Sequence, residues 1–469
     1  MVSSRDAGGE NLKQNRMRIL AISLCFIFCI SLVGPVAAKH SKKHVFVVAP
    51  SGDTTGVTDT ANIQQAIDDV IAAGKGTVLL EEGDFYTCET LVGANFDGTF
   101  KGSGTGATVL HSIENFPIQD PANRGFENPQ MLLFYQDEDT TSTQSHPYKI
   151  QLSDFTVKVD QPTEVWLPEY GGFRAMNTIE VTGKVAGEWS DEAVSYYDVT
   201  AKNLEFLGEV GEIYGPFGMS IQNSLFIQGR VNADTFANEK ISGKYVIEGC
   251  YFENSLGSSV VPGQTVDSHI RIVRNTYVNT MIGPEVYDLC NSRLEVAFND
   301  LSLSPTGWYG IYLANGMYAS SLEPGRAYIH HNHIEVPAYV VGIWVDDFLA
   351  VPGEVEGVSV FAHHNDIVLD GEYARGIYAF GVQDAILLRN TISGYGEAGI
   401  VTGTDHPWYG MPDDVGGWKM VLNDMSDLTA DVAAIWLGTG THDCWVLHRG
   451  PSSSVLDEGT NNHLMFLWW

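Results

Sequence analysis

The 469 residues include 58 acidic and only 26 basic side chains, a net charge of −32 that disfavours nucleic acid and anionic lipid as partners. Hydrophobic residues make up 44% of the chain and charged residues 18%, so a large core can form and disorder is excluded as the dominant state. The 49 glycines favour many short strands joined by turns.

The chain opens with a targeting segment. Four basic residues precede an apolar run from Ile19 to Val33, and the small residues Val36, Ala37 and Ala38 follow it. The run is short of the roughly 20 apolar residues that a spanning helix needs. Residues 1–38 are therefore predicted to be a cleaved signal peptide rather than a membrane anchor. The mature protein is expected to be secreted or held at the cell surface, without membrane insertion.

Residues 39–110 are predicted to form an N-terminal cap and first coil. Apolar side chains recur at helical spacing over residues 61–73, with Thr60 as the expected N-cap and Gly74 as the stop. A short amphipathic helix beside strands can cover the open end of a stacked β core. The strands expected around this helix span residues 45–48, 77–80 and 85–87.

Several motifs in this region follow one another in a known order. They are Gly52–Asp59, Ile63–Ile67, Gly76–Leu80, Gly83–Tyr86 and Gly102–Leu110. This order resembles the N-terminal signature of the pectate-lyase-like superfamily of right-handed parallel β-helices. The resemblance implies an all-β solenoid with a short capping helix. It implies little about the reaction, because the superfamily includes lyases, hydrolases, epimerases, phage tailspikes and non-catalytic surface proteins.

An asparagine recurs through the C-terminal half at separations of 24, 33, 33, 25 and 33 residues. Such self-similarity predicts that residues 111–469 form stacked coils, with longer loops at one corner of the 33-residue coils. The asparagine is expected to take the left-handed corner and to bond neighbouring coils as a ladder. Gly249 is interpreted as the same corner one coil earlier. The six asparagines are Asn275, Asn299, Asn332, Asn365, Asn390 and Asn423.

A second strand recurs in each coil and starts with glycine-isoleucine or a close variant. Alternation points the isoleucine inward and the next side chain outward, so that the outward side chains line up along the stack. An outward aromatic stripe beside a carboxylate is suited to binding a sugar polymer. The alternative is that overlying loops bury these rings as secondary packing. The outward residues are Glu285, Tyr312, Trp344, Tyr378 and Trp436.

Asp346 and Asp347 end one of these strands as adjacent carboxylates. Such a pair can supply the acid and the base of glycosidic hydrolysis, or it can hold Ca²⁺. A plain strand-end turn is the alternative. The pair resembles the Asp-Asp element of polygalacturonases. The Gly-His-Gly and Arg-x-Lys elements of that family are absent, so no catalytic assignment carries over by motif.

His331 precedes the corner asparagine Asn332 and is a candidate proton donor. Histidines also stand at positions 330, 363 and 364, so that four imidazoles fall on adjacent coils. Imidazoles in such a cluster can transfer protons or bind metal ions. The alternative is a solvated face beside a structural corner.

These features predict a secreted carbohydrate-active enzyme that cleaves a polysaccharide as a lyase or a glycoside hydrolase. Its catalytic candidates are Asp346, Asp347, Glu285 and His331, and its stacking platform is Tyr312, Trp344, Tyr378 and Trp436. The alternative function is a non-catalytic β-helix at the cell surface that binds glycans or has a structural role. The expected partner in both cases is a polysaccharide or surface glycan.

Overall fold

The computed structural model of the chain divides it into residues 1–43 and residues 44–469. The predicted signal peptide lies outside the described residues. No helix in the described part is long and apolar enough to cross a membrane. The structure describes residues 44–113, 130–136, 146–159, 165–167, 172–174, 176–182, 197–207, 211–214, 219–232, 243–255, 257–263, 265–287, 289–315, 325–347, 358–382, 384–403 and 415–467.

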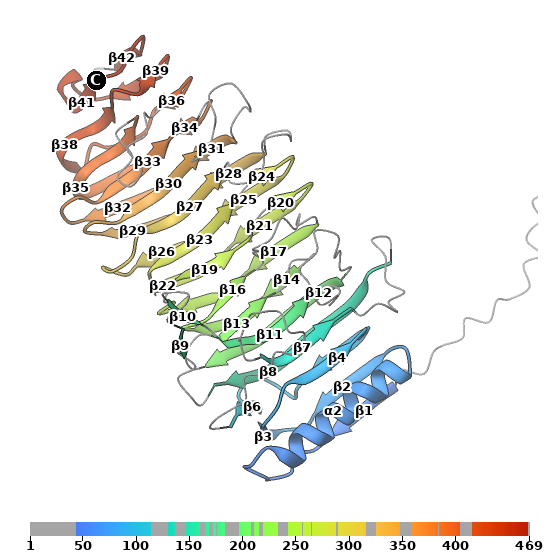
Figure 1. Ribbon diagram of the computed structural model, residues 1–469. Coiled ribbons are helices and arrows are strands. Elements are labelled where there is room, and N and C mark those ends of the chain that lie inside the picture. Colours follow the sequence, from blue (N-terminus) through green and yellow to red (C-terminus); the bar gives the residue numbers. More distant parts are fainter. Residues whose placement is uncertain are drawn as a thin grey trace, which may run out of the picture. The chain divides into compact units, whose positions relative to one another are not determined.

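Parallel strands recur three to a coil, and equivalent strands of successive coils pair to build three faces, here named A, B and C (Figure 1). In one complete coil, β21 (His269–Val273) lies on face A, β22 (Thr276–Thr280) on face B and β23 (Ile282–Tyr287) on face C. The next coil repeats this order and pairs with it strand by strand. The architecture is the right-handed parallel β-helix that the sequence predicts.

Face A runs through the whole described stack, from the first strand to the last. Beyond β21, its strands are β1 (His44–Val48), β2 (Gly76–Leu80), β5 (Gly98–Lys101), β14 (Met219–Gln222), β17 (Lys244–Glu248), β25 (Arg293–Ala297), β28 (Arg326–His330), β31 (Ser359–His363), β34 (Ile386–Leu388), β37 (Lys419–Val421), β40 (Trp445–Arg449) and β42 (His463–Leu467).

Face B follows face A along each coil. Its strands beyond β22 are β3 (Gly83–Thr87), β6 (Thr108–Ser112), β15 (Leu225–Ile227), β18 (Tyr251–Glu253), β26 (Asp300–Leu303), β29 (His333–Pro337) and β32 (Asp366–Asp370). Two long strands bend from face A to face B, namely β8 (Tyr148–Lys158) and β12 (Tyr197–Leu207).

Face C completes the coil. Its strands beyond β23 are β4 (Leu91–Ala94), β7 (Gln130–Tyr135), β11 (Met176–Thr182), β13 (Gly211–Tyr214), β16 (Arg230–Asn232), β19 (Ser258–Val261), β27 (Tyr309–Asn315), β30 (Val341–Asp347), β33 (Arg375–Phe380) and β41 (Val455–Asp457). The strands β35 (Thr391–Thr402) and β38 (Leu428–Leu437) bend from face B to face C.

Short accessory elements lie beside the three faces. They are the antiparallel pair β9 (Val165–Leu167) and β10 (Gly172–Arg174), the parallel pairs β20 (Thr265–Val266) with β24 (Leu289–Cys290) and β36 (Val415–Gly416) with β39 (Thr441–His442), and the 3₁₀ helix η1 (Ser452–Ser454).

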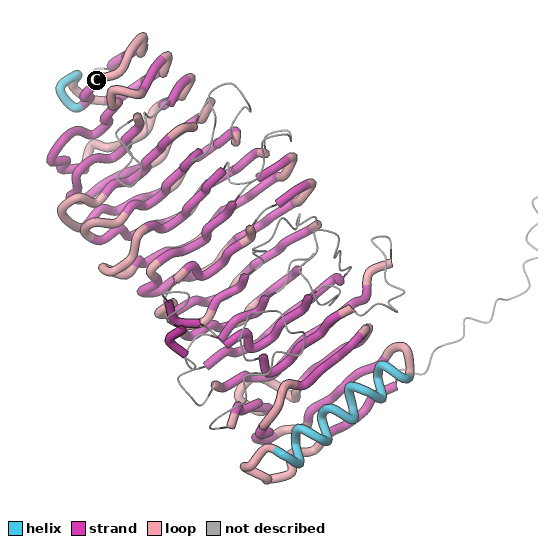
Figure 2. The backbone as a smooth tube through the Cα atoms, viewed as in Figure 1, coloured by secondary structure: helices cyan, strands magenta, loops and turns pink. Residues whose placement is uncertain are grey.

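The α-helix α2 (Val57–Ala72) lies against the first strands, at the N-terminal end of the stack (Figure 2). It buries Ile63, Ile67 and Val70 on one face, as the helical spacing predicts. Strands β1 to β6 continue into β7 and β8 by parallel pairing, so the cap region and the coils share the same faces.

The predicted start of this helix was wrong. The helix begins at Val57, three residues before the expected N-cap Thr60. The Asp53 carboxylate accepts hydrogen bonds from the Thr58 backbone N–H (3.0 Å) and hydroxyl (2.8 Å), which satisfies a donor of the first turn from outside the helix. The Thr60 hydroxyl instead accepts a bond from the Cys88 backbone N–H.

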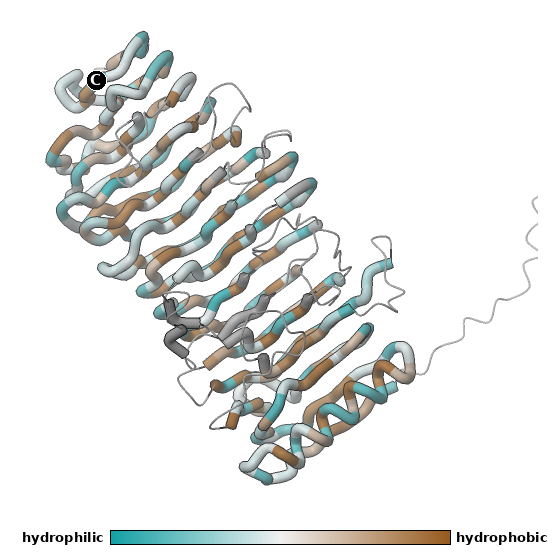
Figure 3. The backbone as a smooth tube through the Cα atoms, in the orientation of Figure 1, coloured by the Kyte–Doolittle hydropathy of each residue, from teal (hydrophilic) through white to brown (hydrophobic). Residues whose placement is uncertain are grey.

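Buried apolar residues from all three faces form the core of the coils. Hydrophobic positions recur along the strands of successive coils (Figure 3). The side chains two residues after the asparagines are buried and form an apolar ladder from Tyr277 to Met425. It continues toward the N-terminus as a stack of aromatic rings, with centroids 4.8–5.0 Å apart. The rings belong to Phe206, Phe226, Phe252 and Tyr277.

The predicted asparagine ladder is confirmed. The backbone N–H of Asn299 donates to Oδ1 of Asn332 (3.1 Å), and its Nδ2 donates to the same oxygen (2.9 Å) and to the Ile272 carbonyl of the preceding coil (2.9 Å). The same bonds link each asparagine from Asn275 to Asn390 with the next one. All six side chains are buried, so these bonds satisfy polar groups that are shielded from solvent.

The left-handed position of this corner lies one residue earlier than predicted. The residues with positive φ are those just before the asparagines, such as Arg274 (φ 57°) and His331 (φ 54°). Gly249 (φ 66°) corresponds to Arg274, and Cys250 takes the ladder position because its N–H donates to Oδ1 of Asn275. The asparagine acts through its amide rather than through left-handed backbone.

Candidate functional site

The outward side of face C has the register that the sequence predicts. Glu285 pairs with Tyr312 in the next coil, Tyr312 with Trp344, and Trp344 with Tyr378. The row continues through Val401 to Trp436. These side chains therefore lie in line along the stack, on five consecutive strand pairings of one face.

The aromatic members of this row are packed rather than forming an open stripe. Trp344 is 5% exposed and Tyr378 1%, whereas Tyr312 and Trp436 are half-buried. The Tyr312 ring centroid lies 5.7 Å from that of Trp344, which in turn lies 5.2 Å from Tyr378, both nearly edge to face. The sequence left two alternatives for these rings, an outward stripe and secondary packing. Trp344 and Tyr378 agree with secondary packing. Trp436 donates its indole N–H to Glu458 (3.0 Å).

Glu285 is buried on this face, 7% exposed, and its carboxylate is surrounded by hydroxyl groups. Tyr309 donates to Oε1 at 2.9 Å, and Tyr287 and Ser258 donate close bonds as well. Burial raises the pKa of Glu285, and the hydrogen bonds from the tyrosines and the nearby Arg230 charge oppose that rise.

Asp346 lies two residues after Trp344 and points to the same side of β30. It is 1% exposed, and the Tyr312 hydroxyl donates to Oδ2 at 3.3 Å. Burial raises the pKa of Asp346 from 3.8 to about 7, and the hydrogen bond from Tyr312 opposes that rise. Tyr312 thus links the two carboxyl groups: it pairs with Glu285 in register and bonds to Asp346.

The predicted calcium site at Asp346 and Asp347 is not assembled by the described residues. Asp347 ends β30, and its side chain lies outside the described residues. In the described ranges no group of three or more His, Cys, Asp or Glu side chains is arranged to hold a metal ion. The calcium site at Asp346 and Asp347 therefore stays a prediction.

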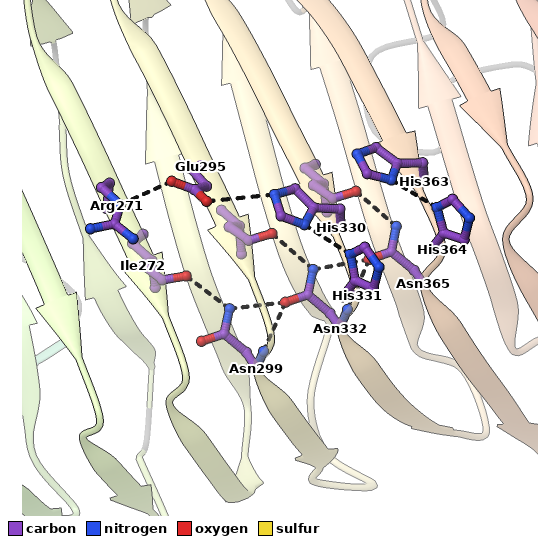
Figure 4. Close-up of polar contacts among 12 residues, drawn as sticks. Arg271, Ile272, Glu295, Asn299, His330, His331, Asn332, His363, His364 and Asn365 are labelled. Atoms are coloured by element: carbon purple, nitrogen blue, oxygen red, sulfur yellow. Dashed lines mark hydrogen bonds and ion pairs between the residues drawn. The ribbon is translucent and has the colours of Figure 1, made fainter.

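His331 lies at the corner between faces A and B (Figure 4), whereas Glu285 and Asp346 belong to strands of face C. Its ring stacks on His364 (5.2 Å), and His330 stacks on His363 (4.8 Å). Within each coil the two Nδ1 atoms are 3.0 and 2.9 Å apart. The left-handed backbone at this corner turns the His331 side chain outward, so the structure does not bring it together with Asp346.

A carboxylate also contacts this histidine cluster. Glu295 lies between Arg271 (Nε to Oε2, 2.9 Å) and His330 (Nε2 to Oε1, 3.6 Å). Burial and the neighbouring imidazoles lower the pKa of His363 to about 4, and burial lowers that of His330 as well. These shifts favour the neutral form of the His330 and His363 rings at neutral pH.

The sequence did not predict Tyr309, Tyr287 or Ser258 as site residues. Tyr287 follows Glu285 by two positions on the same side of β23, and this spacing was a usable signal. Tyr309 was hidden, because strict alternation from Tyr312 assigns it to the inner side. It packs instead with the outer cluster, 4.4 Å from the Tyr312 ring centroid.

No protein-family model and no curated protein sequence matches the chain. Among solved structures, it is similar to the A-module of a mannuronan C-5 epimerase from Azotobacter vinelandii (14% identity, 87% of this chain and 93% of that chain, TM-score 0.36). It is also similar to a family 28 exopolygalacturonase of Yersinia enterocolitica (11%, 90% and 78%, TM-score 0.43). A third match is PfbA, a surface adhesin of Streptococcus pneumoniae (11%, 85% and 90%, TM-score 0.41). At these identities and scores, the matches carry no argument about function.

Proposed function

We propose that the chain is a secreted enzyme that cleaves a polysaccharide, by hydrolysis or elimination, on the outer side of face C. The observation that supports this most is the Asp346 carboxyl group, which is buried, bonded to Tyr312 and has a pKa of about 7. A carboxylic acid that keeps its proton near neutral pH can protonate a glycosidic oxygen as the bond breaks.

Glu285 supplies the second carboxyl group of the proposed reaction. Hydroxyl groups of Tyr287, Tyr309 and Ser258 donate to it, and these hydrogen bonds stabilise its ionised form. An ionised Glu285 would act as the base or would stabilise positive charge on the sugar. Two carboxyl groups in different environments are the usual acid and base of glycoside hydrolysis.

The test is turnover of a polysaccharide panel by the protein without residues 1–38. Polygalacturonate, alginate, xylan and α-1,3-glucan would be incubated with it, and reducing ends and the ultraviolet absorbance of unsaturated uronates would be followed. Reducing ends without absorbance identify a hydrolase, and both together identify a lyase. An arm with EDTA, followed by added Ca²⁺, tests the predicted calcium requirement at Asp346 and Asp347.

The site itself is tested by Asp346→Asn, which keeps the shape of the side chain but removes the acid. We expect turnover to fall about 100-fold or more. The matched control is Asp300→Asn, an exposed aspartate of β26 on face B, which should leave turnover unchanged. Full activity of Asp346→Asn would refute the assignment of Asp346 as the acid. No turnover of any polysaccharide in the panel would refute the proposal that the protein is an enzyme.

The second candidate is a non-catalytic, glycan-binding β-helix. The burial of Trp344 and Tyr378 favours it, because buried rings offer no open platform for a sugar chain at the carboxyl groups. Retained polysaccharide binding with no turnover of any substrate would support this candidate instead.

A further inference from the structure

Four aromatic side chains are exposed where successive coils pass from face B to face C. They belong to connections or bends on four consecutive coils, and two of the connections join β29 to β30 and β32 to β33 (Figure 1). We name this group the B–C ledge. Its members and their exposed fractions are Trp308 (54%), Tyr339 (68%), Tyr373 (55%) and Tyr395 (40%).

Backbone hydrogen bonds between coils hold the ledge together. The Tyr339 N–H donates to the Glu372 carbonyl (2.9 Å), and the Gly371 N–H donates to the Tyr395 carbonyl (3.0 Å). The Tyr339 and Tyr373 rings stack with centroids 5.0 Å apart and planes 26° apart. Because coils repeat at about 4.8 Å, four positions extend roughly 14 Å along the stack.

The requirements of the fold do not explain these tyrosines. Tyr339 (φ 65°) and Tyr373 (φ 58°) hold left-handed backbone, which is unfavourable for a bulky residue and easy for glycine or asparagine. Left-handed positions elsewhere carry small polar residues, such as Asn291 and Asp267, and at the corner between faces A and B also larger ones, such as Arg274. The two rings are mostly exposed, so they contribute little to the core that would offset this cost.

The surroundings of the ledge are acidic. Asp370 and Glu372 flank Tyr373 and are exposed, and Asp431 accepts a hydrogen bond from the Tyr395 hydroxyl (2.9 Å). Arg375 is the next basic residue along the chain after Tyr373. It pairs with Glu397, and its guanidinium group stacks over the buried Tyr378 ring. Carboxylates accept hydrogen bonds from sugar hydroxyls and repel uronates, so an uncharged glycan fits this surface.

We propose that the B–C ledge binds an uncharged polysaccharide, whose pyranose faces contact the exposed rings. The ligand class rests on the proposed function, whereas the ledge is separate from the carboxyl groups that would do the chemistry. Trp308 directly precedes Tyr309 of the Glu285 site. A chain bound on the ledge would therefore lie beside face C.

The experiment measures binding separately from turnover. Affinity electrophoresis would compare the protein in gels that contain β-glucan, galactomannan or α-glucan with gels that contain polygalacturonate or alginate. We expect at least one uncharged polysaccharide to retard the protein and the two polyuronates not to. The double variant Tyr339→Asn, Tyr373→Asn should weaken that binding about tenfold.

The design keeps the fold intact, because asparagine takes left-handed backbone readily. Tyr339→Phe with Tyr373→Phe keeps the rings and should keep binding, and Trp445→Ala, which removes an exposed ring on face A, should have no effect. Asp346→Asn should lose turnover but keep retardation, which separates the ledge from the proposed catalytic site. Wild-type binding by the double asparagine variant, binding to polyuronates alone, or no binding at all would overturn the proposal.

Discussion

At the scale of single residues, the two buried carboxyl groups of face C differ in how their charge is compensated. Three hydroxyl groups donate to Glu285, whereas the Tyr312 hydroxyl bonds to Asp346 at 3.3 Å. Sequence spacing placed both groups on the outward side of one face. It could not give their burial, because burial depends on what packs outside the coil.

The raised pKa of Asp346 makes a prediction about stability. An acid whose folded pKa is about 7, against 3.8 when unfolded, binds more protons in the folded state between these values. Stability is then lost as pH rises from about 4 to about 7, by a few kcal/mol at most. Asp346→Asn should raise the melting temperature at pH 8 and change it little at pH 4. Thermal unfolding followed by circular dichroism checks this, with Asp370→Asn as an exposed control.

The histidine cluster predicts that stability changes with pH in the opposite direction. Since the pKa of His363 is about 4 when folded and about 6.5 when unfolded, the unfolded chain binds more protons between these values. Stability is present above pH 6.5 and is lost as pH falls toward 4. His363→Gln should narrow the difference in melting temperature between pH 7 and pH 4.5. The exposed His269→Gln should leave that difference as in the wild type, and an unchanged difference for His363→Gln would contradict the pKa argument.

At the scale of elements, the asparagine corner shows what repetition in a sequence reveals. The separations identified the ladder residues, because a buried amide that bonds its copies must recur once a coil. They did not identify the left-handed residue, since arginine, phenylalanine and histidine carry no signal for positive φ. The start of α2 was missed for a similar reason, because its first-turn donors bond to Asp53, outside the periodic segment.

Removing one rung of the ladder should be costly. Asn332→Ala removes the oxygen that accepts hydrogen bonds from the backbone N–H and the side-chain amide of Asn299. It also removes the amide that donates to the Val296 carbonyl, so each of these buried groups loses a hydrogen bond. Buried polar groups without partners cost about 1–3 kcal/mol each, so we expect a loss of about 3 kcal/mol or more. Urea unfolding measures it. Glu335→Ala, an exposed change on the same coil, should stay within about 0.5 kcal/mol of the wild type.

At the scale of the described stack, the fold follows from the sequence. The signature around the cap and the asparagine spacing predicted stacked coils joined by an asparagine ladder. The open aromatic stripe did not follow, because alternation reports which side of a sheet a residue occupies and not what covers that side. The ledge was missed because its residues lie in connections, outside any periodic pattern.

The helix α2 protects one end of this stack. Its residues Ile63, Ile67 and Val70 cover the first coil. Without the helix, this coil would expose apolar surface beside unpaired strand edges. Ile67→Asp should open this end and promote self-association, seen as a larger species by light scattering. Gln65→Asp, on the exposed side of the same helix, should remain as the wild type. A monodisperse, stable Ile67→Asp variant would show that the end does not need the cap.

The ladder bonds are the same for every coil length. The link from Asn275 to Asn299 closes over 24 residues and the link from Asn332 to Asn365 over 33, with amide distances of 3.1 and 2.9 Å. The connection from face C to face A differs in length between coils: β23 ends at Tyr287 and β25 begins at Arg293, whereas β27 ends at Asn315 and β28 begins at Arg326. A chain built in this way can therefore change the length of its connections while its coils continue to stack on the same amide bonds.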